Sequence, residues 1–251
     1  MIAAWDRLLE TRVSGRPLAM TRLAVAAAAL VWLHALSGRF RAGFAVGQLH
    51  IGWPVIGDRL IGLAPAVPAT FWAVGAVVLA SGWWARAGAA SLALGVALFM
   101  AADRQHYANG TYLLLLVAVL LVFADSGASW TPWGPDRRRT PWWPTFLLAS
   151  QLSLVYGYAA LHKFRPEALR GETVDWQLRG PAADLISWSG VPAVLNTLGG
   201  MAELFCAIGL WFAVTRRWAV VVGVLLHLGI LVFMRDSFGL LAFSLVSVGL
   251  Y

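Results

Sequence analysis

Residues 194–234 read VLNTLGGMAELFCAIGLWFAVTRRWAVVVGVLLHLGILVFM, two apolar runs separated by Arg216 and Arg217. Each run approaches the roughly 20 apolar residues that an α-helix needs to cross a bilayer. Because the bilayer core offers no water to backbone N–H and C=O groups, such runs cross it as helices. The stretch therefore predicts two neighbouring transmembrane helices joined by a short basic turn.

The same character extends over the whole chain of 251 residues, of which 60% are hydrophobic and 12% charged. This charged share is about half that of an average soluble domain. We therefore predict an all-α fold, a polytopic transmembrane helical bundle with seven to eight spans, the last of which can be a half-span. The apolar segments lie at residues 22–37, 66–85, 87–102, 111–127, 145–162, 194–215, 218–234 and 238–251.

The arginines indicate how the bundle lies in the membrane. Strict alternation of spans places the connections with Arg7 to Arg22, Arg86, Arg137 to Arg139 and Arg216–Arg217 on one side. The positive-inside rule makes that side cytoplasmic, and the N-terminus with it. The net charge of +7 is then explained by anchors against anionic headgroups of the lipid bilayer, and no nucleic-acid partner is expected.

Two parts are predicted along the chain. In residues 1–21, Ile2, Trp5 and Leu8 fall on one helical face, a pattern typical of an amphipathic helix at the membrane interface. Residues 22–251 are predicted to form a single transmembrane domain, because neither long connection, 38–65 or 163–193, can build a core of its own. A functional site must then lie among the helices and these two connections, both of which are predicted to be on the outer face.

Lys163 is the single lysine in a chain with 18 arginines, and it lies at the outer end of the segment 145–162. An ammonium group in a dry site can lose its proton and act as a base, whereas a guanidinium group cannot. A lysine that only snorkels to the interface would explain the same residue without chemistry. Both interpretations stay open at this point.

Glu203 and His227 are ionisable residues inside predicted spans. At 1.5 Å per residue they lie ~14 Å and ~10 Å below the outer ends of two antiparallel helices. This similar depth predicts that they pair, either within a site or as a structural hydrogen bond between helices. Tyr156 shares a helix face with Lys163, so that its hydroxyl could bind a ligand oxygen or be satisfied locally.

Other motifs of known chemistry are missing from the sequence. The single cysteine and the remaining histidines show no metal-ligand spacing, so we predict no metal. The chain has no P-loop, no dinucleotide-binding G-x-G-x-x-G after a strand and no G-x-S-x-G elbow. Nucleotide-driven work is therefore not expected.

Several separated stretches resemble the membrane domain shared by vitamin K-dependent gamma-carboxylases and their bacterial relatives, the HTTM (horizontally transferred transmembrane) proteins. ANGTYLLLLVAVLLVFADSGASW (Ala108 to Trp130) is similar to the family's asparagine-containing segment and the long helix after it. The resemblance is strongest over residues 108–251 and weak before them. It rests mainly on QLSLVYGYAALHKFRPEALRG (Gln151 to Gly171), GGMAELFCAIGLWF (Gly199 to Phe212) and LLHLGILVF (Leu225 to Phe233).

The resemblance implies an integral protein of the bacterial cytoplasmic (inner) membrane with the lysine on the outer face. In the carboxylases this lysine is the base that starts quinol oxidation, and the oxygenated quinone then deprotonates a peptide glutamate for attack on carbon dioxide. The implied cofactor is a quinone or quinol of the menaquinone or vitamin K type. The resemblance implies that Lys163, Glu203 and His227 are catalytic, and that Asn109, Tyr156 and Gln151 bind substrate or cofactor.

The chain also departs from the family pattern. Gly110 stands where a histidine is expected after the asparagine, and Ala168 stands where a tryptophan is expected. These 251 residues hold no counterpart of the large extramembrane domain that binds the peptide substrate. Carboxylation of a protein would therefore require a separate protein partner.

Two classes of function stay open after this comparison. The first is an enzyme, either gamma-carboxylase-like or a quinone-linked membrane oxidoreductase or lyase. The second is a non-catalytic membrane partner, an export or immunity component, or a small-molecule carrier on the same fold. A retinal protein is not expected, because Lys163 lies at a helix end beside Arg165 and Pro166 rather than mid-span in the last helix.

Overall fold

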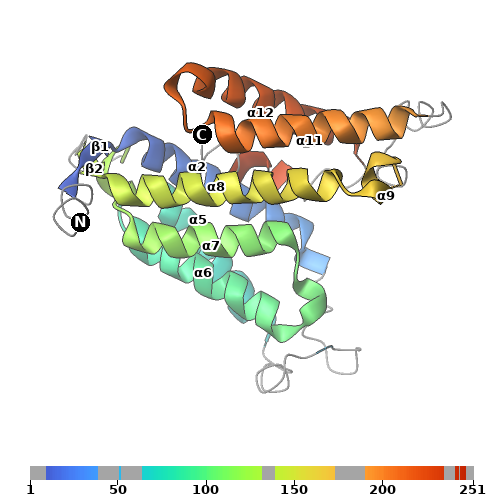
Figure 1. The fold of residues 1–251 in the computed structure, drawn as a ribbon. Coiled ribbons are helices and arrows are strands. Elements are labelled where there is room, and N and C mark those ends of the chain that lie inside the picture. The colour runs from blue at the N-terminus through green and yellow to red at the C-terminus, as the bar shows by residue number, and fades with distance from the viewer. Residues whose placement is uncertain are drawn as a thin grey trace, which may run out of the picture. The chain divides into compact units, whose positions relative to one another are not determined.

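The computed structural model describes residues 10–38, 51, 64–131, 139–172, 190–234, 241–242 and 244–246. Long helices make up most of this described part (Figure 1), which confirms the all-α fold expected from the sequence. The contacts between Cα atoms divide the chain into two compact units, an N-terminal unit over Met1–Leu148 and a C-terminal unit over Ala149–Gly249. A single domain over residues 22–251 stays a prediction.

The long described helices of the N-terminal unit follow the predicted apolar segments closely. Two short 3₁₀ helices accompany them: η1 (Arg104–His106) precedes the last of these helices, and η2 (Ser126–Ala128) follows it. Pro17 occupies the first turn of the first helix, where its missing N–H costs no hydrogen bond. The helices are α2 (Arg16–Ala35), α5 (Ala66–Ser81), α6 (Ala85–Ala102) and α7 (Asn109–Phe123).

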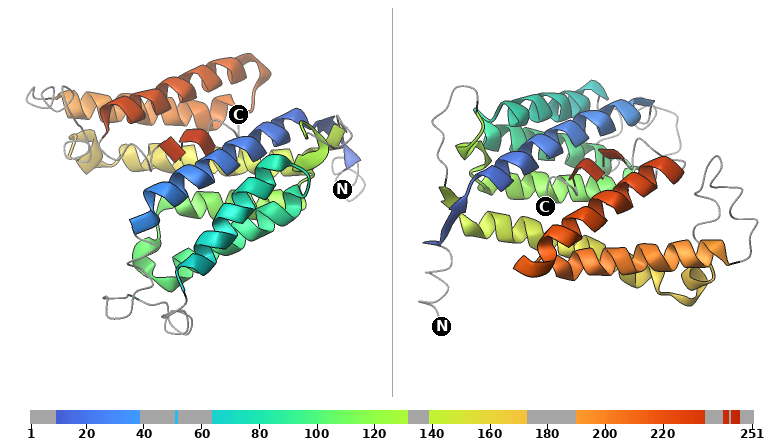
Figure 2. Two further views of the ribbon diagram at one scale, coloured as in Figure 1. Left: turned by 180° about the vertical axis from the view of Figure 1, so that it is seen from behind. Right: turned by 90° about the horizontal axis from the view of Figure 1, so that it is seen from above.

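Glycines bring the backbones of α5 and α6 into direct contact. A Cβ atom at Gly75 of α5 would collide with the backbone of Leu92, and one at Gly88 of α6 would collide with the backbone of Leu79. Gly95 faces the backbone of α5 in the same way. The two helices run side by side in both views of Figure 2, an approach that small residues permit between membrane helices.

Aromatic side chains fill the remaining core of the N-terminal unit. The fully buried Trp72 donates its indole N–H to the carbonyl of Ala29 at 2.8 Å, which connects α5 to α2. The ring of Phe99 packs edge-on against Trp72 and stacks on His106 with ring centroids 4.2 Å apart. Because His106 is buried and its Nδ1 bonds the Phe99 carbonyl, this histidine is part of the core.

A short antiparallel sheet joins two distant parts of the N-terminal unit. Strand β1 (Arg12–Ser14) pairs with strand β2 (Arg139–Pro141), with Val13 opposite Thr140. The sequence predicts an interfacial helix over residues 1–21, but β1 interrupts that range and α2 already begins at Arg16. Backbone pairing with β2 replaces helical hydrogen bonds here, while the face with Ile2, Trp5 and Leu8 lies outside the described residues.

The C-terminal unit contains most of α8 (Trp142–Lys163), the short α9 (Pro166–Leu169), α11 (Val191–Gly209) and α12 (Ala213–Phe233). Helices α8 and α11 are antiparallel, because Trp211 after α11 donates to Ser153 near the middle of α8 at 2.8 Å. At the opposite end, Asn196 early in α11 contacts Lys163. Helices α11 and α12 meet at residues 210–212 and diverge from there (Figure 2).

Several helices have the length and composition of membrane spans. In the described part of the chain, α2, α6, α11 and α12 are long and apolar enough to cross a membrane, and α5 and α7 are shorter apolar helices. Large hydrophobic side chains on their surfaces, such as Val214 and Leu225, are exposed to more than half of their area. Such an apolar exterior is stable against lipid, which supports an integral membrane protein.

Candidate functional site

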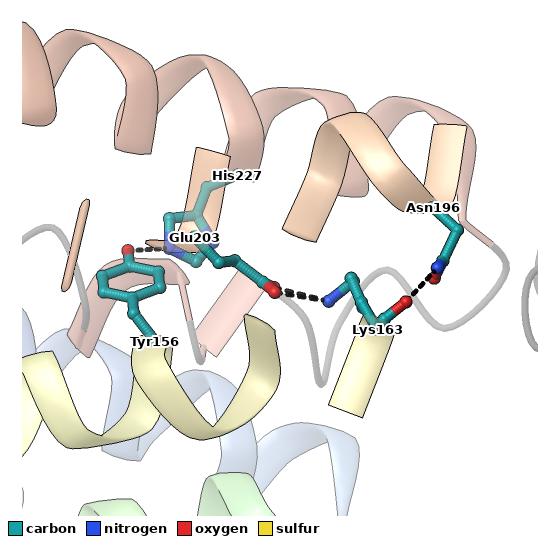
Figure 3. A network of polar contacts seen from close by, with 5 residues as sticks. All are labelled: Tyr156, Lys163, Asn196, Glu203 and His227. Carbon is teal, nitrogen blue, oxygen red and sulfur yellow. Dashed lines mark hydrogen bonds and ion pairs between the residues drawn. The ribbon is translucent and has the colours of Figure 1, made fainter. Parts of the chain in front are cut away.

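The C-terminal unit brings the single lysine of the chain to a buried glutamate (Figure 3). The Nζ atom of Lys163 donates to both carboxylate oxygens of Glu203, at 2.6 Å to Oε1 and 2.7 Å to Oε2. The side chain of Glu203 is 8% exposed and that of Lys163 is 28% exposed. The result is a charge-assisted pair in which the glutamate side chain is buried and the lysine side chain is partly exposed.

Two glycines of α11 make room for the lysine. A Cβ atom at Gly200 would lie 3.2 Å from Lys163 Cβ, and one at Gly199 would lie 3.6 Å from Lys163 Cε. The side chain of a helical residue leans towards the N-terminus of its own helix. The stem of Lys163 therefore extends back along α8, across these glycines, to Glu203.

Asn196 fixes the backbone from which the lysine extends. Its amide Nδ2 donates to the carbonyl of Lys163 at 2.8 Å, and the residue is 2% exposed. This carbonyl belongs to the last turn of α8, where no further helical N–H is available to it. On α11, spacings of four and three residues place Asn196, Gly200 and Glu203 on one helix face. This face therefore binds both the backbone carbonyl and the amine of Lys163.

A second polar cluster joins α8, α12 and the C-terminal segment. The hydroxyl of Tyr156 is 2.7 Å from Nε2 of His227, and the hydroxyl of Ser244 is 3.1 Å from Nδ1 of the same ring. All three side chains are buried. Both ring nitrogens are thus hydrogen-bonded, and either neutral tautomer of the imidazole satisfies the chain of three groups.

The predicted pairing of Glu203 with His227 is wrong. Glu203 bonds Lys163, whereas His227 bonds Tyr156 and Ser244. The prediction compared the depths of the two residues but omitted the length of the lysine side chain, which extends from the end of α8. An ammonium with two carboxylate hydrogen bonds is a stronger partner for a buried carboxylate than a neutral imidazole.

The other predicted binding residues lie in different places. Gln151 is a half-buried residue of α8, twelve positions before Lys163 and hence ~18 Å away along the helix. Asn109 is the first residue of α7, is exposed and belongs to the N-terminal unit. Tyr156 is the predicted binding residue that shares the C-terminal unit and helix face of Lys163, two turns deeper in α8.

The sequence prediction missed Asn196 and Ser244. A signal for Asn196 existed, because Asn196, Gly200 and Glu203 repeat the spacing of Tyr156, Ala160 and Lys163 on the other helix. Two polar stripes with a small residue between their ends are typical of facing helices in a membrane. Ser244 carried no such signal, since its contact with His227 arises from tertiary packing.

The arrangement is suited to proton chemistry. In the described residues, no three His, Cys, Asp or Glu side chains are grouped so that they could hold a metal ion. The available groups are an amine–carboxylate pair and a phenol–imidazole–hydroxyl chain, both of which hold exchangeable protons. Such groups can bind a polar head of a lipid-soluble molecule, accept its proton or transfer one.

Comparison with known protein families identifies a domain that covers most of the chain. The family model described as the HTTM domain matches residues 67–248, which include Lys163, Glu203 and His227. The match begins about 40 residues before the stretch in which the sequence resemblance is strong. No curated protein and no solved structure matches the chain. Since the family model covers well over half of the chain and spans both polar clusters, the protein belongs to the HTTM domain family.

Proposed function

We propose that this membrane protein uses Lys163 as the base that removes a proton from a quinol-type lipid. The proposal extends the resemblance to the carboxylase membrane domain and rests on one observation, the bonding of Lys163 Nζ to both oxygens of the buried Glu203. Glu203 gives the amine a fixed position and can take up the proton that otherwise lies on Lys163. The quinol hydroxyl would be the proton donor, and a quinolate its product.

Proton sharing within the pair makes such a base possible. When the proton lies on Glu203, Lys163 is a neutral amine with a free electron pair, and neither group carries charge in the apolar surroundings. When Lys163 takes a proton from the quinol hydroxyl, it forms an ammonium beside the quinolate. Arginine at the same position could pair with Glu203 but would stay protonated. This difference provides the test.

We further propose that His227 and Tyr156 orient the bound molecule, with Gln151 as an additional contact. The hydrogen-bonded chain from Tyr156 through His227 to Ser244 supports this assignment, since it can donate to or accept from a ligand oxygen in either tautomer. The quinone would be of the menaquinone or vitamin K type. Carboxylation of a protein would need a separate partner chain that binds the peptide.

The proposed topology has seven to eight spans in a bacterial cytoplasmic membrane, with the N-terminus in the cytoplasm and Lys163 at the outer face. Seven described helices, α2, α5, α6, α7, α8, α11 and α12, have between 15 and 22 residues and match the first seven apolar segments. α8 is less apolar than its neighbours, since it carries polar residues at Gln151 and Ser153 as well as the site.

A second candidate function is non-catalytic, and the same ion pair favours it. An ammonium bonded to both carboxylate oxygens also connects α8 strongly to α11. The pair would then have a purely structural role, and the protein would be a partner subunit, an export or immunity component, or a carrier. The two candidates differ in what they require of the amine. The first needs an amine that gives up and regains its proton, and the second needs only a positive charge.

The deciding experiment compares Lys163→Arg with the parent protein in proteoliposomes that contain a reduced menaquinone analogue. The assay is run under air, so that dissolved oxygen is the oxidant. We expect Lys163→Arg to melt within a few degrees of the parent but to lose at least about 100-fold in quinol oxidation, since general base catalysis typically contributes 10²–10⁴-fold. Arg165→Gln removes a neighbouring exposed cation and serves as the matched control, with parental activity expected. Parental activity in Lys163→Arg, or none in the parent, would exclude the base and leave the non-catalytic function.

A further inference from the structure

Arg22 is the one fully buried arginine among the described residues, and the proposed chemistry does not use it. The sequence places it in a basic connection at the membrane surface, but the structure places it inside α2, with 0% of the residue exposed. Its Nη1 donates to the carbonyls of Ser126 and Ser129 at 2.9 and 3.3 Å, and its Nη2 to that of Trp130 at 2.8 Å. The described residues thus supply backbone carbonyls to the guanidinium but no carboxylate.

Several hydrogen-bond donors around this guanidinium have no partner within the described part of the chain. A guanidinium has five N–H groups, and its three hydrogen bonds leave two of them, including that of Arg22 Nε, without an acceptor. The buried hydroxyl oxygens of Ser126, Ser129 and Thr131 also have no hydrogen-bond partner. Buried polar groups without partners are rare and costly, and four of the six such atoms in the described residues belong to this arginine and the turn beside it.

The surrounding backbone is shaped around Arg22. Gly82 has a φ of 75°, and a Cβ atom there would collide with the guanidinium of Arg22 and with the methyl group of Thr131. Trp130 has a φ of 56°, the only positive value at a non-glycine residue in the described part of the chain. A positive φ at a residue other than glycine persists where the neighbouring structure requires it, and such residues cluster at active sites and ligand-binding sites.

The position of the cluster in the N-terminal unit points to a membrane surface. The turn follows α7, and Gly82 links α5 to α6, so helix ends meet around the guanidinium. Trp83 and Trp84 are more than 60% exposed and stack on each other, and Trp130 is 48% exposed. Exposed tryptophans at helix ends are typical of the headgroup region of a bilayer.

We infer that the cluster of Arg22, Ser126, Ser129 and Thr131 binds a phosphate group, that of an anionic lipid headgroup or of free phosphate. The groups without partners are guanidinium N–H groups, which only donate, and hydroxyls, which can donate. A phosphate is an acceptor with negative charge and would satisfy several of them at once while neutralising a buried charge. Thr131 is half-buried and next to the exposed Trp130, so the phosphate would enter on that side.

The test measures binding of phosphatidylglycerol to the purified full-length protein by native mass spectrometry, with phosphatidylcholine as the neutral comparison. We expect preferential binding of phosphatidylglycerol, and a dissociation constant about tenfold higher in the triple variant Ser126→Ala, Ser129→Ala, Thr131→Val, because the hydroxyl donors are lost. Arg86→Gln removes an exposed cation beside the exposed tryptophan pair and should leave the affinity unchanged. Thr197→Val, whose hydroxyl bonds the helix backbone elsewhere, controls for loss of a hydroxyl.

Two results would overturn the site: parental affinity in the folded triple variant, or an equal loss of affinity in Arg86→Gln, which would indicate non-specific attraction. If the triple variant does not fold, the three single variants are compared in the same way. Inorganic phosphate distinguishes the two sources. Competition with phosphatidylglycerol identifies a site for free phosphate, and no competition identifies a site that requires the lipid.

Discussion

Glu203 and His227, the two buried acid–base residues of the C-terminal unit, are stabilised in different ways. Glu203 lies beside the amine of Lys163, and both of its oxygens are hydrogen-bonded to that amine. His227 needs no charged partner, since a neutral imidazole is satisfied by Tyr156 on one nitrogen and Ser244 on the other. A buried charge requires a counter-charge, whereas a buried neutral group requires only hydrogen bonds.

This difference predicts the effect of removing one hydroxyl. In Tyr156→Phe a buried nitrogen of His227 loses its partner, and we expect the free energy of unfolding to fall by about 1–3 kcal/mol. Tyr158→Phe on the same helix is the matched control, because Tyr158 is 75% exposed and its loss should change stability by less than about 0.5 kcal/mol. Unfolding by denaturant in detergent micelles measures both. Equal stability of the two variants would contradict a structural role for the Tyr156–His227 bond.

At the scale of elements, the contact between α5 and α6 in the N-terminal unit depends on glycines, which have no side chain. Gly75 and Gly88 let α5 and α6 touch backbone to backbone. In lipid the hydrophobic effect does not drive two apolar helices together, so that close van der Waals contact has to do so. A methyl group at the contact would separate the two helices along their length.

We therefore expect Gly88→Ala to destabilise the protein by about 1–3 kcal/mol, the usual cost of overpacking. Gly229→Ala in α12 should have the opposite effect, since a Cβ atom there has nothing within 4 Å and alanine favours a helix over glycine by about 1 kcal/mol. Melting temperatures of the two variants in the same detergent decide the matter. A Gly88→Ala protein as stable as the parent would show that the α5–α6 contact is looser than described.

For the whole molecule, the proposed orientation is open to a direct test because the chain has a single cysteine. Replacing this buried residue, in the variant Cys206→Ala, gives a chain without thiols. In that background, Glu172→Cys should react with a membrane-impermeant maleimide in intact cells, whereas Arg217→Cys should react only after the membrane is opened. Both positions are exposed. The reverse pattern would show that the positive-inside assignment is inverted and that Lys163 faces the cytoplasm.

The sequence by itself determined that the protein lies in a lipid bilayer, and it determined the positions of most of the helices. Apolar runs of about 20 residues can satisfy their backbone in lipid only as helices, so the first seven predicted segments each coincide with a described helix. The single lysine, the acidic residue of α11 and the tyrosine of α8 were also found from the sequence, because ionisable residues stand out in apolar runs.

Only the tertiary structure decided which of these groups meet. Depth in a helix is linear in sequence and can be counted, but the rotation of each helix and the reach of a long side chain cannot. Lys163 reaches Glu203 because Gly199 and Gly200 leave a path across α11, and His227 is left to Tyr156 and Ser244. The burial of Arg22 has the same origin, since whether an arginine at a helix end faces water or its own protein depends on what packs around that end.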